Sequence, residues 1–258
     1  MPDGKCRGPR VIHAGLRGAA QLSDRMDARE VLDLLDLTLL DHEADDAALD
    51  SLCKKANEHK PAAVCVFSEH APYVGSRLDD GVALAAVAAG FPVGDESPED
   101  IVEAIREAVA SGAEEVDCVL EPREGDGFPD ESDLAKLIAM REATKGCILK
   151  VIIEAPLLDE RRLRAVTRMV LAVGADFVKS CTGKRGGCGD EVAGILAYEV
   201  HRHGLATGDS SGVKLSGGIG SKADAERLIG IVTGHDPSLV GSHRLRIGAS
   251  SLLEDLVG

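Results

Sequence analysis

Short apolar runs recur along the chain, and each is followed by a longer stretch in which charged and apolar residues alternate with helical spacing. Eight runs have the length and the composition of buried strands, at residues 32–40, 62–67, 82–91, 114–120, 147–154, 175–182, 212–218 and 245–251. Between them, segments such as SPEDIVEAIREAVASGA and DERRLRAVTRMVLAVGA predict helices that end at a Gly-Ala pair. This alternation predicts an α/β protein whose strands close into a single (β/α)8 TIM barrel.

The chain has no proline-rich linker and no shift in composition that would divide it. Its 258 residues suit one barrel, a fold that runs to about 250 residues. We therefore expect a catalytic barrel domain over residues 29–258. Residues 1–28 are expected to form an N-terminal extension, either a capping helix or a loose arm without an assigned function.

Composition narrows the choice of partner and compartment. The balance of 29 Lys plus Arg against 44 Asp plus Glu opposes attraction to nucleic acid and to anionic membranes, so a small-molecule partner is expected. Seven scattered cysteines without a CxxC pair, and no apparent secretory leader or membrane span, predict a soluble cytoplasmic protein with reduced thiols and no metal.

Lysines occupy positions inside three of the predicted strands. Side chains in a barrel strand alternate between the interior and the helix layer, so residues two apart share a face. On that rule Lys179 shares a face with Phe177 and Cys181, and Lys150 shares one with Ile148, Ile152 and Glu154. The inward-facing groups are then expected to include Asp36, Thr38, Asp117, Lys150, Lys179 and Lys214. We expect these groups to meet near the C-terminal mouth of the barrel, where barrel active sites lie.

A plainer interpretation is that each lysine forms a buried ion pair with Asp117, Asp36 or Glu154, and for any one lysine alone that interpretation is favoured. However, three of only eleven lysines lie on three successive strands, and burying each ammonium costs several kcal/mol. A site explains this arrangement better than packing does.

Clustered lysines have a chemical use. A neighbouring cation and burial both disfavour the ammonium form, and lowering a lysine pKa from about 10.4 to about 7 takes roughly 4–5 kcal/mol. The neutral amine can attack an aldehyde or ketone to form a Schiff base, which permits a carbon–carbon bond to break or form. Asp117 and a second lysine could carry the proton that such chemistry moves.

The ends of the last three strands are rich in glycine and hydroxyl groups. They read Thr182-Gly183-Lys184, Ser216-Gly217-Gly218 and Gly248-Ala249-Ser250-Ser251. Unhindered backbone N–H groups, hydroxyls and one ammonium are groups that bind phosphate. Because barrels often bind phosphate after strands seven and eight, we expect a phosphate site here.

These residues carry a family resemblance. The strings LLDLTLLD, AAVCVF, GFPVG, GAEEVDCVL, LKVIIE, GADFVKSCTGK, GVKLSGGI and RIGASSLL resemble those of deoxyribose-phosphate aldolase, in the same order between Leu32 and Leu253. The resemblance implies reversible cleavage of 2-deoxy-D-ribose 5-phosphate to glyceraldehyde 3-phosphate and acetaldehyde, without a cofactor. It also implies a homodimer or homotetramer, and a role in deoxyribonucleotide and carbohydrate catabolism.

By the same resemblance, Lys179 forms the Schiff base while Asp117 and Lys214 relay protons. The implied substrate-binding residues are Asp36, Thr38, Lys150 and Thr182, together with Cys65, which parity also allows as a small inward packing group. The implied phosphate-binding residues are Gly183, Lys184, Gly217, Gly218, Gly248, Ser250 and Ser251.

The chain departs from the family pattern at two places. Ser180-Cys181-Thr182-Gly183 stands where Thr-Ser-Thr-Gly is common, which would place a thiol inward beside Lys179, and Glu154-Ala155-Pro156 stands where Glu-Thr-Gly is usual. Two alternatives therefore stay open. One is a Schiff-base aldolase of the same fold acting on another phosphorylated sugar or aldehyde, and the other is a non-catalytic module that binds a sugar phosphate.

Overall fold

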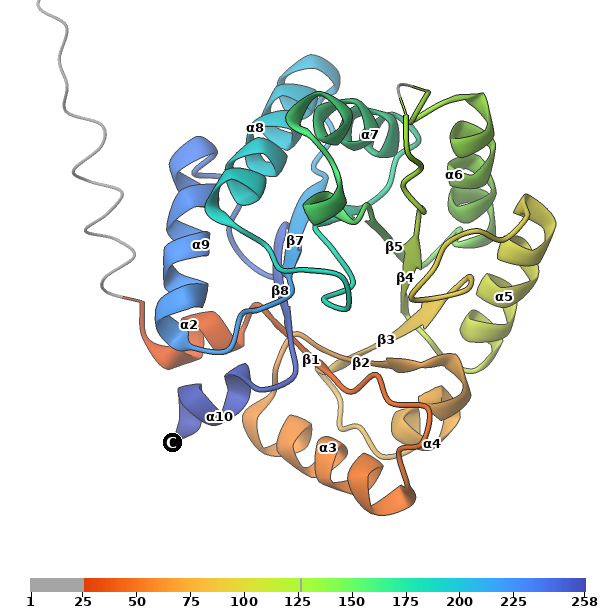
Figure 1. Ribbon diagram of the computed structural model, residues 1–258. Helices are drawn as coiled ribbons and strands as arrows, with labels where there is room; N and C mark the ends of the chain where they lie inside the picture. Colours follow the sequence, from red (N-terminus) through yellow and green to blue (C-terminus); the bar gives the residue numbers. More distant parts are fainter. Residues whose placement is uncertain (1–25, 126) are drawn as a thin grey trace, which may run out of the picture.

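The computed structural model describes residues 26–125 and 127–258. Within these residues, eight parallel strands form a closed barrel in sequence order, each paired with the next and β8 paired with β1 (Figure 1). The strands are β1 (Leu35–Thr38), β2 (Ala63–Phe67), β3 (Ala83–Ala88), β4 (Glu115–Val119), β5 (Ile148–Ile152), β6 (Phe177–Lys179), β7 (Gly212–Ser216) and β8 (Leu245–Ala249). The predicted TIM barrel is confirmed, and every predicted strand contains an observed one.

Helices surround the barrel as an outer ring (Figure 1). They are α2 (Ala28–Leu32), α3 (Asp46–His59), α4 (Ala71–Gly75), α5 (Pro98–Ala110), α6 (Glu131–Ala143), α7 (Glu160–Ala172), α8 (Asp190–Thr207), α9 (Lys222–His235) and α10 (Leu252–Val257), with 3-10 turns at Ser68–His70 and Ala155–Leu157. The boundary predicted between an extension at 1–28 and a barrel at 29–258 stays a prediction, since residues 1–25 lie outside the described part. No helix in the described part is long and apolar enough to cross a membrane.

Local sequence signals set the helix ends. The side chains of Asp45, Ser97 and Asp159 accept a hydrogen bond from a backbone N–H in the first turn of the helix that follows each of them. The Gly-Ala pairs after α5 and α7 place Gly112 and Gly174 at φ of 100° and 78°, a left-handed conformation that glycine adopts without strain.

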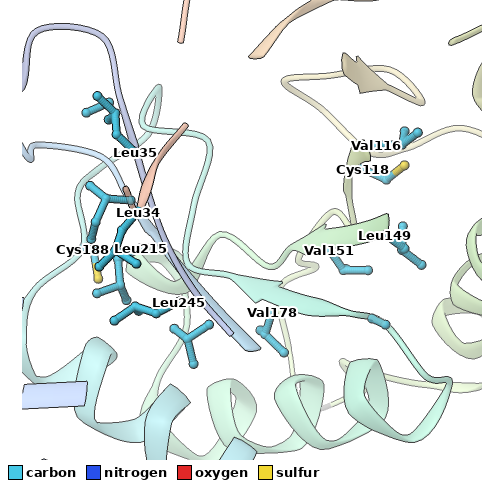
Figure 2. Packing of buried hydrophobic residues seen from close by; sticks show 14 of the residues in the cluster. Leu34, Leu35, Val116, Cys118, Leu149, Val151, Val178, Cys188, Leu215 and Leu245 are labelled. Atoms are coloured by element: carbon cyan, nitrogen blue, oxygen red, sulfur yellow. The ribbon is translucent and has the colours of Figure 1, made fainter. Parts of the chain in front are cut away.

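Alternate residues of the strands build two separate layers. Outward-facing residues such as Val116, Leu149, Val178 and Leu215 pack against the helices and belong to one large apolar core (Figure 2). Inward-facing residues of β2 to β5 form a smaller apolar cluster that includes Cys65, Phe67, Val119 and Ile152. The remaining part of the barrel interior holds the charged residues described next.

Candidate active site

Seven charged side chains from six strands meet inside the barrel, and we call them the lumen charge cluster. Each of these residues is 4% exposed or less. The members are Asp36, Glu115, Asp117, Lys150, Lys179, Lys214 and Arg246, and they come from β1, β4, β5, β6, β7 and β8. Ion pairs join side chains from opposite sides of the ring, so these residues face inward, as the alternation of positions predicts.

Asp117 lies at the centre of the cluster. Its Oδ2 accepts hydrogen bonds from Lys179 Nζ and from Lys214 Nζ, both at 2.7 Å, and its Oδ1 lies 3.3 Å from Lys150 Nζ. Burial alone would raise the pKa of Asp117, but the three ammonium groups outweigh burial and hold that pKa well below its ordinary value. Asp117 is therefore a carboxylate in the resting protein.

Asp36 bridges Lys150 and Lys214. Its Oδ2 accepts from Lys150 Nζ at 2.8 Å and lies 2.6 Å from Lys214 Nζ. Burial alone would lower the pKa of Lys150 and of Lys214, but Asp117 and Asp36 outweigh it and raise both values. Lys150 and Lys214 therefore remain ammonium ions, and the predicted buried ion pairs with Asp36 and Asp117 are present.

Lys179 differs from the other two lysines in its access to solvent. It borders a cavity of about 490 Å³ at the C-terminal mouth of the barrel, whereas the fully buried Lys150 and Lys214 do not line that cavity. Lys179 is the last residue of β6 and pairs laterally with Lys214 of β7. A molecule in the cavity can thus directly reach the amine of Lys179, which is the one cluster lysine in the cavity wall, with the ammonium groups of Lys150 and Lys214 buried behind it.

The loops that follow β1, β6, β7 and β8 form the rest of the cavity wall. All of the residues predicted to bind phosphate line it, namely Gly183, Lys184, Gly217, Gly218, Gly248, Ser250 and Ser251. Gly217 has a φ of 90°, and a Cβ added there would lie 2.7 Å from Cys181 Sγ and 2.8 Å from the Gly186 carbonyl oxygen. The close approach of these loops therefore requires glycine at position 217.

Among the predicted substrate-binding residues, Thr38 and Thr182 also line the cavity. The other three, Asp36, Cys65 and Lys150, are fully buried and lie outside the cavity wall. Burial raises the pKa of the Cys65 thiol to about 11. Cys65 is thus a neutral packing group in the apolar cluster, while Asp36 contacts Lys214 and Lys150 contacts Asp117.

Two residues at strand ends differ from the rest of the predicted site, and for Glu154 the expected ion pair is wrong. Glu154 does not pair with the lumen lysines: its φ is 46°, its Oε1 accepts from the Thr182 backbone N–H at 2.8 Å, and the same Oε1 lies 3.8 Å from Arg185. Cys181 does not line the cavity, and its thiol donates to the Ser216 carbonyl oxygen at 2.8 Å, so its predicted inward orientation beside Lys179 stays a prediction. Both residues lie beyond the last paired residue of their strand, where alternation no longer fixes the face.

Two members of the cluster, Glu115 and Arg246, are absent from the predicted site. Arg246 pairs with Glu115 at 2.7 Å and with Asp36 at 2.5 Å, and Glu115 also pairs with Lys150. Their positions carry a signal in the sequence, since Glu115 lies two residues before Asp117 and Arg246 lies two residues before Gly248. The same alternation that selects the three lysines would have selected both.

Comparison with known proteins gives a consistent result. Residues 25–236 match the family model described as DeoC/LacD family aldolase. The chain is 33% identical to deoxyribose-phosphate aldolase of Clostridium perfringens over 79% of this chain and 89% of that protein. It is 34% identical to deoxyribose-phosphate aldolase of Finegoldia magna over 87% and 97% of the two chains. Among solved structures, the tetrameric deoxyribose phosphate aldolase of Aeropyrum pernix matches with a TM-score of 0.75 and 26% identity, over 93% of this chain and 96% of that one.

Proposed function

This chain belongs to the DeoC/LacD family of aldolases, and from that premise we propose that it reversibly cleaves 2-deoxy-D-ribose 5-phosphate to glyceraldehyde 3-phosphate and acetaldehyde. The observation that carries the proposal is the position of Lys179. Its amine borders the cavity, and the glycine-rich loops that we assign to phosphate line the same cavity. An aldehyde carbon and a phosphate group on one small sugar would therefore contact the two parts of a single site.

In the first step, the neutral amine of Lys179 adds to the C1 aldehyde carbon of the open-chain sugar. The carbinolamine that forms loses water and gives an iminium ion, whose positive nitrogen withdraws electrons from C2. Lys214 and Asp117 lie on the buried side of this nitrogen, and Asp117 Oδ2 contacts both lysines at 2.7 Å. We assign to this pair the transfer of the protons that carbinolamine formation and dehydration require.

In the second step, a base removes the proton of the C3 hydroxyl, and the C2–C3 bond breaks as C3 becomes the aldehyde of glyceraldehyde 3-phosphate. The bonding electrons move to C2 and leave an enamine on Lys179. We assign the acceptance of this proton, through a water molecule, to the Asp117 carboxylate, and its return to Asp117 together with the Lys214 ammonium that Asp117 contacts. Protonation of the enamine at C2 and addition of water then release acetaldehyde and restore the amine.

The phosphate would bind at the rim of the cavity. Lys184 supplies an ammonium group, and Gly183, Gly217 and Gly218 expose backbone at positive φ. Direct binding of the sugar hydroxyls is assigned to Thr38 and Thr182, which line the cavity. As further parts of the proposal, the chain forms a homodimer or homotetramer and acts in the cytoplasm.

A second candidate, aldol cleavage of a different phosphorylated sugar or aldehyde, is favoured by one feature of the rim. Pro156 lies against the loop after β6, where a Cβ added to Gly186 would be 2.7 Å from Pro156 Cβ. That loop begins with the Gly183-Lys184 segment of the cavity wall. Pro156 therefore packs closely against the loop that carries the assigned phosphate site, and this packing keeps a different phosphorylated substrate as the second candidate.

A coupled assay for glyceraldehyde 3-phosphate tests the proposal. The wild-type protein should release this product from 2-deoxyribose 5-phosphate, and Lys179→Leu and Lys179→Arg should release none. The arginine variant is the matched control, because it keeps a cation beside Asp117 but cannot form a Schiff base with an aldehyde. Release of another aldehyde would support the second candidate. Binding of the sugar phosphate with no turnover would instead identify a non-catalytic module.

A further inference from the structure

We propose that Glu115 and Arg246 are positioning residues that set the net charge of the lumen charge cluster and thereby the pH at which Lys179 becomes a free amine. The proposal deepens the proposed function and rests on it, because it concerns the amine that would form the Schiff base. Neither residue lines the cavity, and both lie in the buried part of the barrel interior, 2% and 4% exposed.

The cluster holds an odd number of charges. Its four cations are Lys150, Lys179, Lys214 and Arg246, and its three anions are Asp36, Glu115 and Asp117. With every ionisable group charged, the cluster therefore carries one positive charge more than its carboxylates balance. An unbalanced charge in a water-poor interior is costly, and release of a single proton removes the imbalance.

The contacts distinguish the three lysines of the cluster. Lys150 faces the carboxylates of Asp36, Glu115 and Asp117, and Lys214 faces those of Asp36 and Asp117. Lys179 pairs with Asp117 alone within the cluster and borders the cavity. The guanidinium of Arg246 stays protonated in proteins. Of the three lysines in the cluster, Lys179 thus has the fewest carboxylate partners and the most direct access to the cavity, so we assign the released proton to it.

Glu115 and Arg246 act on Lys179 through two intermediates. Arg246 pairs with Asp36 Oδ1, while Asp36 Oδ2 holds Lys150 and Lys214. Glu115 pairs with Lys150, which in turn lies 3.3 Å from Asp117. Other ionisable groups near Lys179 are Cys65 of β2, which burial keeps neutral, Cys181, and Asp41 and Lys184, which line the same cavity. None of these groups changes when residue 115 or 246 is replaced. The variants therefore differ from the wild-type protein in the net charge of the lumen charge cluster.

The two positions predict shifts of opposite sign. Glu115→Gln leaves two unbalanced positive charges, so Lys179 should lose its proton more readily and the acid limb of the kcat/KM profile should move to lower pH. Arg246→Met leaves three cations and three anions, so Lys179 should keep its proton and the same limb should move to higher pH. Each shift should be on the order of one pH unit, as expected for a unit charge some ten ångströms away at an effective dielectric constant of about 20.

The experiment measures kcat/KM for 2-deoxyribose 5-phosphate between about pH 5 and pH 9 on the full chain. The double variant Glu115→Gln/Arg246→Met restores an excess of one charge and should restore the wild-type limb, as should the charge-conserving Arg246→Lys. Glu199→Gln removes a buried carboxylate outside the barrel and should leave the limb unchanged. A loss of folding stability alone would lower activity without moving the limb in opposite directions.

Several results would overturn the proposal. Unchanged limbs in both single variants, or shifts of the same sign, would show that these residues support the barrel without setting the charge on Lys179. If one single variant does not fold, the other single variant together with Arg246→Lys decides the matter. Failure of the proposed function looks different, since the wild-type protein itself would then turn over no substrate at any pH.

Discussion

Replacing Asp117 by Asn should destabilise the protein strongly, because it removes the carboxylate that the side-chain nitrogens of Lys179 and Lys214 both contact at 2.7 Å. Lys150 and Lys214 are fully buried, so neither can turn its ammonium to water when Asp117 is lost. Removing one partner of a buried ion pair typically costs about 3–5 kcal/mol. We expect the free energy of unfolding of Asp117→Asn to fall by about this amount, in spite of the near-identical shape of Asn.

Glu199 offers a matched control. Its side chain is also fully buried, but its partners Arg164, Arg168 and Arg202 are 28%, 46% and 53% exposed and can be hydrated when the carboxylate is lost. Glu199→Gln should therefore cost only about 1–3 kcal/mol. Urea unfolding of both variants, with unchanged m-values, gives the comparison. A loss for Asp117→Asn no larger than that for Glu199→Gln would refute the claim that the buried ammonium groups of Lys150 and Lys214 have no route to water.

Three further predictions concern pH, the cavity loops and the phosphate. The neighbouring cations outweigh burial and lower the pKa values of Asp36 and Asp117 in the folded state. These two carboxylates therefore stabilise the fold above about pH 4, and their contribution should be lost as the pH falls below that value. Equal unfolding free energies at pH 5 and pH 3 would contradict this prediction. Gly217→Ala should raise KM and lower stability more than Gly112→Ala. Both glycines have positive φ, but a Cβ at 217 would collide with Cys181, whereas a Cβ at 112 meets nothing within 4 Å. Similar KM values for the two variants would count against the loop geometry. Lys184→Met should raise KM for the phosphorylated sugar by roughly tenfold or more with little change in kcat. Turnover of unphosphorylated deoxyribose should be unaffected. An equal loss of activity on both sugars would show that Lys184 does not bind the phosphate.

The number, order and type of the strands could be predicted from the sequence because each strand is a separate apolar run with a helix after it. Alternation within a strand also placed Asp36, Asp117, Lys150, Lys179 and Lys214 on one interior surface, and the ion pairs confirm this. That rule holds only while the backbone stays extended. The predicted strand at 175–182 is paired only over Phe177–Lys179. The alternation rule therefore does not fix the direction of the Cys181 side chain.

Which charged groups actually touch depends on the stagger of the strands, and a single sequence carries no direct information about it. Lys179 pairs laterally with Ile152 and Lys214, yet its ionic partner is Asp117 of β4, two strands away. The cavity wall likewise depends on how four loops meet at the barrel mouth. Composition predicted a phosphate site in these loops, which stays a prediction, whereas the exclusion of Asp36 and Lys150 from the wall is seen only in the three-dimensional structure.

Borohydride reduction of the protein mixed with 2-deoxyribose 5-phosphate, followed by peptide mass spectrometry, tests the central claim most directly. The chain contains eleven lysines, three of them in the barrel interior and Lys184 at the cavity wall. We expect a reduced adduct on Lys179 and on no other lysine, and none on any lysine in Lys179→Arg. An adduct on Lys150, Lys184 or Lys214, or turnover without any trapped adduct, would contradict it.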